Sequence, residues 1–159
     1  LRIMLRKLHA DRGGEGIFVL RRGDVNLFSL IEQATNFGER LAMAQEYLPA
    51  IRQGDKRILL IDGEPLGAVL RVPASGESRA NLHVGGSAAE GILDDSDKRI
   101  IRTIGPRLRK DGLFLVGIDV IGGKLTEINV TSPTGIQEMS RIDGVNYSSS
   151  VIDAVEAKK

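Results

Sequence analysis

Residues 114–134 contain two strand-like stretches separated by a Gly-Gly pair, and this segment constrains the fold more than any other. The pair predicts a tight turn, so the flanking stretches should form an antiparallel hairpin. Glu127 and Asn129 are two residues apart and point to one face, while Asp119 on the neighbouring strand is near enough to converge with them. Two carboxylates and an amide oxygen are ligands that Mg²⁺ accepts, usually together with phosphate oxygens. A hairpin with solvated polar residues on one face is the alternative interpretation.

The spacing of apolar residues predicts the remaining elements. A helix is expected over residues 27–37, capped by Asp24 or Asn26 and ended by Gly38. A second helix should start at the cap Ser96 and end near Lys110 and Gly112, and a short third should start at Ser148 or Ser149. The expected strands, the last two of which are joined at Asp62-Gly63, are residues 1–7, 17–20, 41–46, 57–62 and 66–72. Pairs of strands interrupted by helices indicate an α+β fold with a largely antiparallel sheet.

The composition argues against several classes of function. Lys and Arg number 22 and Asp and Glu number 21, so the net charge of +1 gives no field that would attract nucleic acid or an anionic membrane. The absence of Cys excludes disulfides, thiolate zinc sites and a Cys nucleophile. No stretch approaches the ~20 apolar residues of a membrane span. We therefore expect a cytoplasmic protein that binds neither nucleic acid nor a membrane. Because the sequence begins at Leu1, inside a strand-like stretch, we also expect that an upstream portion is missing.

Two longer runs carry a family resemblance. One is Leu125-Thr-Glu-Ile-Asn-Val-Thr-Ser-Pro-Thr134, which follows Val116-Gly-Ile-Asp119, and the other is Met43-Ala-Gln-Glu-Tyr-Leu-Pro-Ala-Ile-Arg-Gln-Gly-Asp-Lys-Arg57. The first closely resembles the metal-binding segment of bacterial glutathione synthetase, an ATP-grasp ligase, and the second resembles the nucleotide hinge of that family. The resemblance covers nearly all of residues 13–159. It implies an ATP-grasp type of α+β fold, with a largely antiparallel sheet, flanking helices and a missing amino-terminal portion.

The resemblance also implies how the chain is divided. Residues 1–48 would belong to the lobe that carries the phosphate loop and the hinge. Residues 49–159 would form the carboxy-terminal ATP-grasp lobe, which includes the metal hairpin at 114–134. Residues 73–90 are small, polar and rich in glycine, without an apolar period, and we expect them to form a mobile lid.

ATP-binding residues follow from the same resemblance. Lys7 would lean on the phosphates, and a loop containing Gly13 and Gly14 would fold over them. Glycine allows backbone N–H groups to approach phosphate oxygens closely, which is the physical reason for this arrangement. The hinge would read adenine through its backbone groups; its residues are Gln45, Glu46, Tyr47 and Leu48.

Arginines supply the implied catalytic groups. Arg57 would hold a carboxylate or an acyl phosphate through two N–H groups. Asp55 would accept a hydrogen bond from the ribose or orient Arg57. Arg71, at a strand end, and Arg79, in the lid, would neutralise the charge of the reaction intermediate and exclude water. The implied substrate-binding residues are Asn81, Ser132, Pro133 and Thr134.

By this resemblance the chain is the carboxy-terminal catalytic part of an ATP-dependent peptide ligase. ATP would phosphorylate the cysteinyl carboxylate of γ-glutamylcysteine, and the amine of glycine would attack the acyl phosphate to give glutathione, ADP and phosphate. Mg²⁺ or Mn²⁺ would be held by Asp119, Glu127 and Asn129. The family also implies a homo-oligomer for the full-length protein.

Two alternatives remain open. The run Lys7-Leu-His-Ala-Asp11 differs from the family's Lys-Pro-Leu-Asp-Gly, and the chain lacks an amino-terminal half that supplies another ATP lysine and part of the substrate site. Both differences favour a non-catalytic ATP-binding remnant. A ligase that joins different amino acids is the other alternative, because the metal and ATP residues constrain the chemistry more than the substrate.

Overall fold

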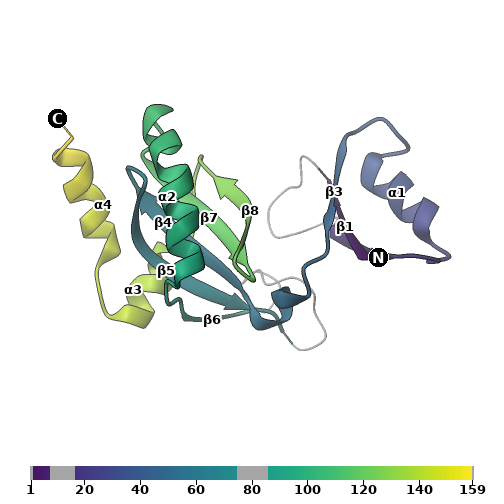
Figure 1. Cartoon of the computed structure of the whole chain (residues 1–159), viewed down its shortest axis with the longest axis horizontal. Helices are drawn as coiled ribbons and strands as arrows, with labels where there is room; N and C mark the ends of the chain where they lie inside the picture. Colours follow the sequence, from purple (N-terminus) through teal and green to yellow (C-terminus); the bar gives the residue numbers. More distant parts are fainter. Residues whose placement is uncertain (1, 8–16, 75–85, 159) are drawn as a thin grey trace. The chain divides into compact units, whose positions relative to one another are not determined.

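A computed structural model of the chain describes residues 2–7, 17–74 and 86–158. The chain divides into two compact units, Leu1–Pro49 and Ala50–Lys159. Figure 1 shows the helices and strands of each unit. Most residues of the predicted lid, and the whole predicted glycine loop, lie outside the described residues.

The first unit is a three-stranded antiparallel sheet with one helix. Strand β1 (Arg2–Lys7) lies between β2 (Ile17–Arg21) and β3 (Ala42–Glu46), and helix α1 spans Leu27–Thr35. The buried residues Leu5, Leu20 and Ala34 form its core, because alternate strand residues and one helix stripe face each other. These elements agree with the expected strands and with the start of the expected helix.

Helix α1 is shorter than its apolar pattern predicts. It ends at Thr35, and both Asn36 and Phe37 adopt left-handed backbone conformations, with φ of 49° and 55°. The side chain of Phe37 is therefore 80% exposed instead of continuing the buried stripe. Asn36 terminates the helix two residues before the predicted stop at Gly38, since Asn is one of the few residues that tolerate this conformation. Of the two predicted caps, Asn26 occupies the position, although its side chain makes no capping hydrogen bond.

The second unit is built on a five-stranded antiparallel sheet in the order β6-β5-β4-β7-β8. A 3₁₀ turn, η1 (Pro49–Gln53), precedes it. The strands are β4 (Asp55–Ile61), β5 (Glu64–Val72), β6 (Ser87–Glu90), β7 (Leu115–Ile121) and β8 (Lys124–Asn129). The helices are α2 (Asp95–Lys110), α3 (Ile136–Asp143) and α4 (Tyr147–Glu156).

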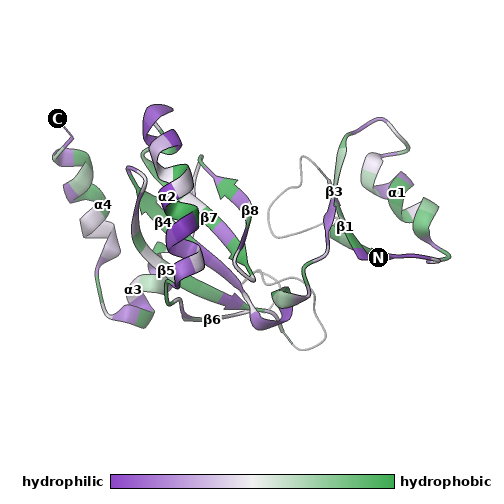
Figure 2. Cartoon of the chain, in the orientation of Figure 1, coloured by the Kyte–Doolittle hydropathy of each residue, from purple (hydrophilic) through white to green (hydrophobic). Residues whose placement is uncertain are grey.

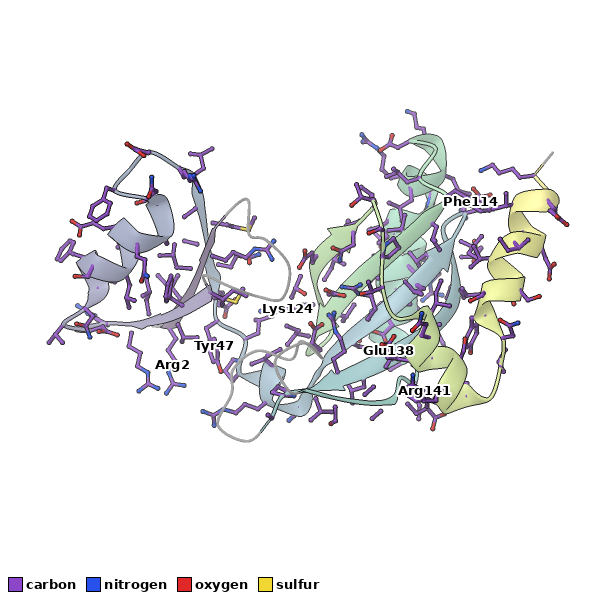
Figure 3. All side chains as sticks on the ribbon, turned by 180° about the vertical axis from the view of Figure 1, so that it is seen from behind. Arg2, Tyr47, Phe114, Lys124, Glu138 and Arg141 are labelled. Atoms are coloured by element: carbon purple, nitrogen blue, oxygen red, sulfur yellow. The ribbon has the colours of Figure 1, made fainter. Side chains whose placement is uncertain are left out.

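Different helices cover the two faces of this sheet. One face packs against α2, and Ile58, Leu60 and Ile118 lie in its core. The opposite face is covered in part by α3, whose Met139 packs with Leu59 and Val69. Figure 1 shows α2 across one side of the sheet, and Figure 3 shows α3 and α4 from the other side. In Figure 2 hydrophilic and hydrophobic residues both occur along α2, as expected for a helix with one buried stripe.

The amino-terminal end of α2 is fixed by carboxylates. Asp94, not the predicted Ser96, is the N-cap, and it forms a reciprocal capping box with Asp97. Lys56 on β4 donates to Asp97 at 2.5 Å and to Asp94 at 3.1 Å. Because the side chain of Asp97 is fully buried, this ion pair joins the start of α2 to the sheet.

Besides the 3₁₀ turn η1, two elements of this unit were not predicted, and one predicted helix begins earlier than expected. β6 lies within the segment that was predicted to be a loop. It was missed because its sequence, Ser-Ala-Ala-Glu, lacks the large apolar side chains that indicate a strand, and backbone pairing to β5 holds it in place. α3 is short, with only Met139 buried, and lies between Gly135 and Gly144, both with positive φ. α4 starts at Tyr147, one residue before Ser148, after the N-cap Asn146.

The last helix contacts the rest of the unit at both ends, and at its start Tyr147 packs against the cluster of Leu59, Val69 and Met139. None of the residues of α4 is buried, and Ile152 is 58% exposed. Lys158 lies 4.6 Å from the ring centre of Phe114 and 3.3 Å from Asp62 Oδ1; Figure 3 labels Phe114. Among the described residues, no helix is both long and apolar enough to cross a membrane.

The turn between β4 and β5 touches α2 through two glycines. Asp62 and Gly63 have φ of 49° and 77°, as a type I′ hairpin turn requires. A Cβ atom added at Gly105 in α2 would lie 2.7 Å from the backbone oxygen of Gly63, and one added at Gly63 would lie 2.7 Å from the oxygen of Gly105. The helix therefore lies directly against the turn, with no room for a side chain on either residue.

Gly105→Ala should destabilise the protein by about 1–3 kcal/mol, because the added methyl group forces the helix away from the turn. Helix propensity alone predicts the opposite sign, a gain of about 1 kcal/mol. Urea unfolding measures the difference. Thr103→Ala, at an exposed position of the same helix, is the control and should stay within about 0.5 kcal/mol of the wild type. A stabilising effect of Gly105→Ala would contradict the close contact.

Candidate functional site

Charged side chains gather on the sheet face opposite α2. Asp55 and Arg57 alternate with Lys56 on β4, so they point away from that helix. Asp55 pairs in register with Arg71 on β5, and Arg57 pairs with Asp119 on β7. We refer to Asp55, Arg57, Arg71 and Asp119 as the ion cluster.

Arg57 and Asp119 form a two-pronged ion pair. The Nε of Arg57 donates to Oδ1 of Asp119, and its Nη2 donates to Oδ2 at 2.9 Å. The two residues are only 7% and 4% exposed, respectively. In addition, Nη1 of Arg57 donates to the backbone oxygen of Thr134 at 3.2 Å. Removing one partner of such a buried pair typically costs about 3–5 kcal/mol, because the other charge is left buried and unpaired.

Arg71 is shared between two carboxylates. Its Nη2 lies 2.5 Å from Asp55 Oδ2 and 2.9 Å from Asp119 Oδ2. In the pair of Arg71 and Asp55, two buried atoms lack a hydrogen-bond partner among the described residues, namely Nε of Arg71 and Oδ1 of Asp55. Within the described part of the chain, Arg71 is thus held by one nitrogen, whereas Arg57 uses all three.

The predicted metal residues face one another across β7 and β8. Asp119 pairs directly with Glu127, and Gly117 pairs with Asn129. Residues paired across an antiparallel ladder share a face, and so do residues two apart on one strand. Asp119, Glu127 and Asn129 therefore lie on the face that carries the ion cluster. The register shifts just after Asp119, where Thr126 Oγ1 donates to the Asp119 backbone oxygen at 3.1 Å.

Burial and neighbouring charges shift the pKa values in opposite directions. Burial raises the pKa of Asp55 to about 6, and the nearby charge of Asp119 adds to that rise, although Arg71 and Arg57 counteract both. Burial also disfavours the charged form of Asp119, but the hydrogen bond from Arg57 and the charges of Arg71 and Arg57 outweigh it and lower its pKa. Asp119 is therefore the more firmly ionised of the two carboxylates.

The donor set fits a hard divalent cation. Two carboxylates that face each other and an amide two residues along supply oxygen ligands of the kind Mg²⁺ and Mn²⁺ accept. Nδ2 of Asn129 is buried and has no hydrogen-bond partner among the described residues. Within those residues, no group of three or more His, Cys, Asp or Glu could hold a metal ion, so the third ligand would have to be the amide.

The segment after β8 folds onto the ion cluster through its backbone. A Cβ atom on Gly117 would lie 2.7 Å from Cβ of Pro133, so the glycine makes room for that ring. Thr134 contributes its carbonyl oxygen to Arg57, while its side chain is exposed. The role of Gly117 was not predicted from the sequence, although a glycine inside an apolar strand often marks a close approach. Ser132 is exposed beside them.

Apart from Asp55, which lies on β4 of the second unit, the predicted nucleotide residues belong to the first unit. Lys7 ends β1 and pairs with Ala42, and Gln45 and Glu46 lie on β3, paired with β1. The backbone N–H of Tyr47 donates to the oxygen of Arg2 at 3.2 Å, so the pairing continues just past the strand; both residues are labelled in Figure 3. Leu48 follows and is half-buried. The predicted residues outside the described part of the chain are Gly13, Gly14, Arg79 and Asn81.

Comparison with known sequences assigns the family. Residues 2–144 match the family of the prokaryotic glutathione synthetase ATP-grasp domain. The chain belongs to this family. It is 52% identical over 157 residues to the glutathione synthetase of Synechococcus elongatus and 50% identical over 157 residues to that of Brucella melitensis. These alignments cover 99% of the chain but 49% and 50% of the relatives, so the chain spans about half the length of the relatives it matches.

Solved structures agree on the fold. A D-cycloserine synthetase structure matches with a TM-score of 0.68 and 12% identity, over 98% of this chain and 55% of that one. A D-alanine–D-alanine ligase from Bacillus anthracis complexed with ATP matches with a TM-score of 0.62 and 12% identity, over 99% and 50% of the two chains. At this level of identity the likeness concerns the fold alone. It confirms the predicted ATP-grasp type of α+β architecture.

Because its pKa is about 6 in the folded chain, against an ordinary value of 3.8, Asp55 should make stability depend on pH. The folded state binds the proton more tightly, so this contribution is largest at low pH and disappears as the pH rises through 6. Between pH 5 and 7 it should fall by about 1 kcal/mol. Urea unfolding of the wild type and of Asp55→Asn at both pH values measures this, because the variant lacks the titrating group. Parallel pH profiles for the two proteins would contradict the raised pKa.

Proposed function

We propose that this chain is the ATP-grasp portion of a ligase that joins γ-glutamylcysteine and glycine to form glutathione. The observation that carries the proposal is the shared face of β4, β5, β7 and β8. It gathers two guanidinium groups and the candidate metal residues where an acyl phosphate would need charge neutralisation. Family membership supports the choice of substrates, since the relatives at about 50% identity carry the name glutathione synthetase.

The nucleotide would bind along β3. In the described sheet of the first unit, β3 is an edge strand that pairs only with β1. The outer edge of such a strand presents backbone N–H and C=O groups, which suit the alternating donors and acceptors of adenine. We assign the adenine contacts to Gln45, Glu46, Tyr47 and Leu48. Lys7, Gly13 and Gly14 would contact the phosphates, and Asp55 would bind the ribose or orient Arg57.

Asp119, Glu127 and Asn129 would hold Mg²⁺ or Mn²⁺. A bound divalent cation would neutralise phosphate charge and polarise the phosphoryl group that is transferred. The protein's own contribution would be positioning, because phosphoryl transfer needs little covalent chemistry from the enzyme.

The arginines would act on the acyl phosphate. Arg57 and Arg71 would neutralise the acyl phosphate, together with Arg79 from the lid. Asn81 and the segment of Ser132, Pro133 and Thr134 would bind the peptide substrate. A cytoplasmic location and a homo-oligomer for the full-length protein remain predictions.

A chimera tests this proposal. The chain would replace the matching half of the Synechococcus elongatus glutathione synthetase, to which it aligns over 157 residues. Purified chimera with ATP, Mg²⁺, γ-glutamylcysteine and glycine should release phosphate and form glutathione in equal amounts. Chimeric Glu127→Gln should lose at least about 99% of this turnover, because the substitution keeps the shape of the side chain but removes a charge at the metal site.

Controls separate a wrong proposal from a misfolded protein. Both chimeras should unfold at the same urea concentration, and exposed Thr103→Ala should retain full turnover. A folded chimera that binds ATP but forms no glutathione would favour a non-catalytic ATP-binding role. Product with another amino acid in place of glycine would indicate a different ligase.

A further inference from the structure

Asp119 already uses most of its hydrogen-bonding capacity for guanidinium groups. Its Oδ2 accepts from Nη2 of Arg57 and from Nη2 of Arg71, each at 2.9 Å, and its Oδ1 accepts from Nε of Arg57. An ionised carboxylate offers about four lone-pair positions, so three are taken, including both on Oδ2. A cation that approaches this carboxylate also meets two positive charges directly beside it.

The two arginines differ in how firmly they are held. Arg57 grips both oxygens of Asp119 and also donates to the backbone of Thr134. Arg71 contacts Asp119 through one nitrogen, which it shares with Asp55 at 2.5 Å. Arg71 is therefore the one that can leave Asp119 without losing every carboxylate partner.

The unpaired atoms indicate where Arg71 would go. Nε of Arg71 and Oδ1 of Asp55 are both buried and lack partners among the described residues. Pairing them would turn the single contact between Arg71 and Asp55 into a two-pronged one, the preferred geometry of guanidinium and carboxylate. Such a shift would free a lone pair on Oδ2 of Asp119 and satisfy two buried polar atoms.

We propose that Arg71 competes with a divalent cation for Asp119 and moves to Asp55 when the cation binds. The inference rests on the metal site of the proposed function and adds an order of events to it. Before the cation binds, Arg71 neutralises Asp119. Afterwards its guanidinium is anchored by Asp55, with its remaining N–H groups available to an anionic reactant.

Direct Mn²⁺ binding without nucleotide tests the exchange, with free Mn²⁺ measured by electron paramagnetic resonance. Arg71→Gln should bind Mn²⁺ about tenfold more tightly than the wild type, since a competing positive charge is removed. Asp55→Asn should bind it several-fold more weakly, because among the described carboxylates Arg71 then keeps Asp119 alone as its partner, and one negative charge is lost. Arg109→Gln, which alters an arginine paired with Glu64 beside the β4–β5 turn, should leave Mn²⁺ affinity unchanged.

Glu127→Gln separates this inference from the proposed function. If no variant binds Mn²⁺, or if Glu127→Gln binds it as tightly as the wild type, the metal site is wrong and both ideas fail. If binding depends on Glu127 but Arg71→Gln binds Mn²⁺ no more tightly than the wild type, Arg71 does not compete with the cation, and the metal site stands. Should Arg71→Gln lack a cooperative unfolding transition, Asp55→Asn decides, and unchanged or tighter binding by that variant overturns the inference.

Discussion

The buried ion pair of Arg57 and Asp119 is the interaction on which the second unit depends. It joins the central strand β4 to its neighbour β7, and through the backbone of Thr134 it also holds the segment that leads into α3. Both charges are almost fully buried, so removing either one would leave the other buried and unpaired. The same pair places one carboxylate opposite Glu127, where a cation would bind. Structural and functional demands therefore meet on Asp119.

Side chains that alternate along the strands place apolar residues and the ion cluster at separate positions of the sheet. On β4, Ile58 and Leu60 pack under α2, and Leu59 packs under α3. Lys56 lies between Asp55 and Arg57 but points to the α2 side, where it joins the buried Asp97. A shift of β4 by one residue would exchange these faces and place the ion cluster against the apolar core. The register of β4 is thus fixed by charge as well as by apolar burial.

Much of this architecture could be predicted from the sequence because it depends on local signals. The Asp62-Gly63 and Gly122-Gly123 pairs located both hairpins, and the apolar spacing of Ile101 and Leu108 located α2. β6 and α3 were missed because tertiary pairing, rather than a strong pattern, holds them. The family resemblance implied catalytic roles for Arg57 and Arg71 and a metal-binding role for Asp119, but it gave no sign that the arginines bind the metal carboxylate itself. That contact depends on the pairing of three strands, which no short motif contains.

A crystal soaked with Mn²⁺ and measured for anomalous scattering tests the central claim, that one carboxylate serves both the arginines and the cation. We expect an anomalous peak at about 2.0–2.2 Å from oxygens of Asp119 and Glu127, a distance typical of small divalent cations. We also expect Arg71 to form a two-pronged pair with Asp55 and no longer to contact Asp119. A peak elsewhere on the chain would contradict the account. So would a peak at Asp119 with Arg71 still bonded to that carboxylate.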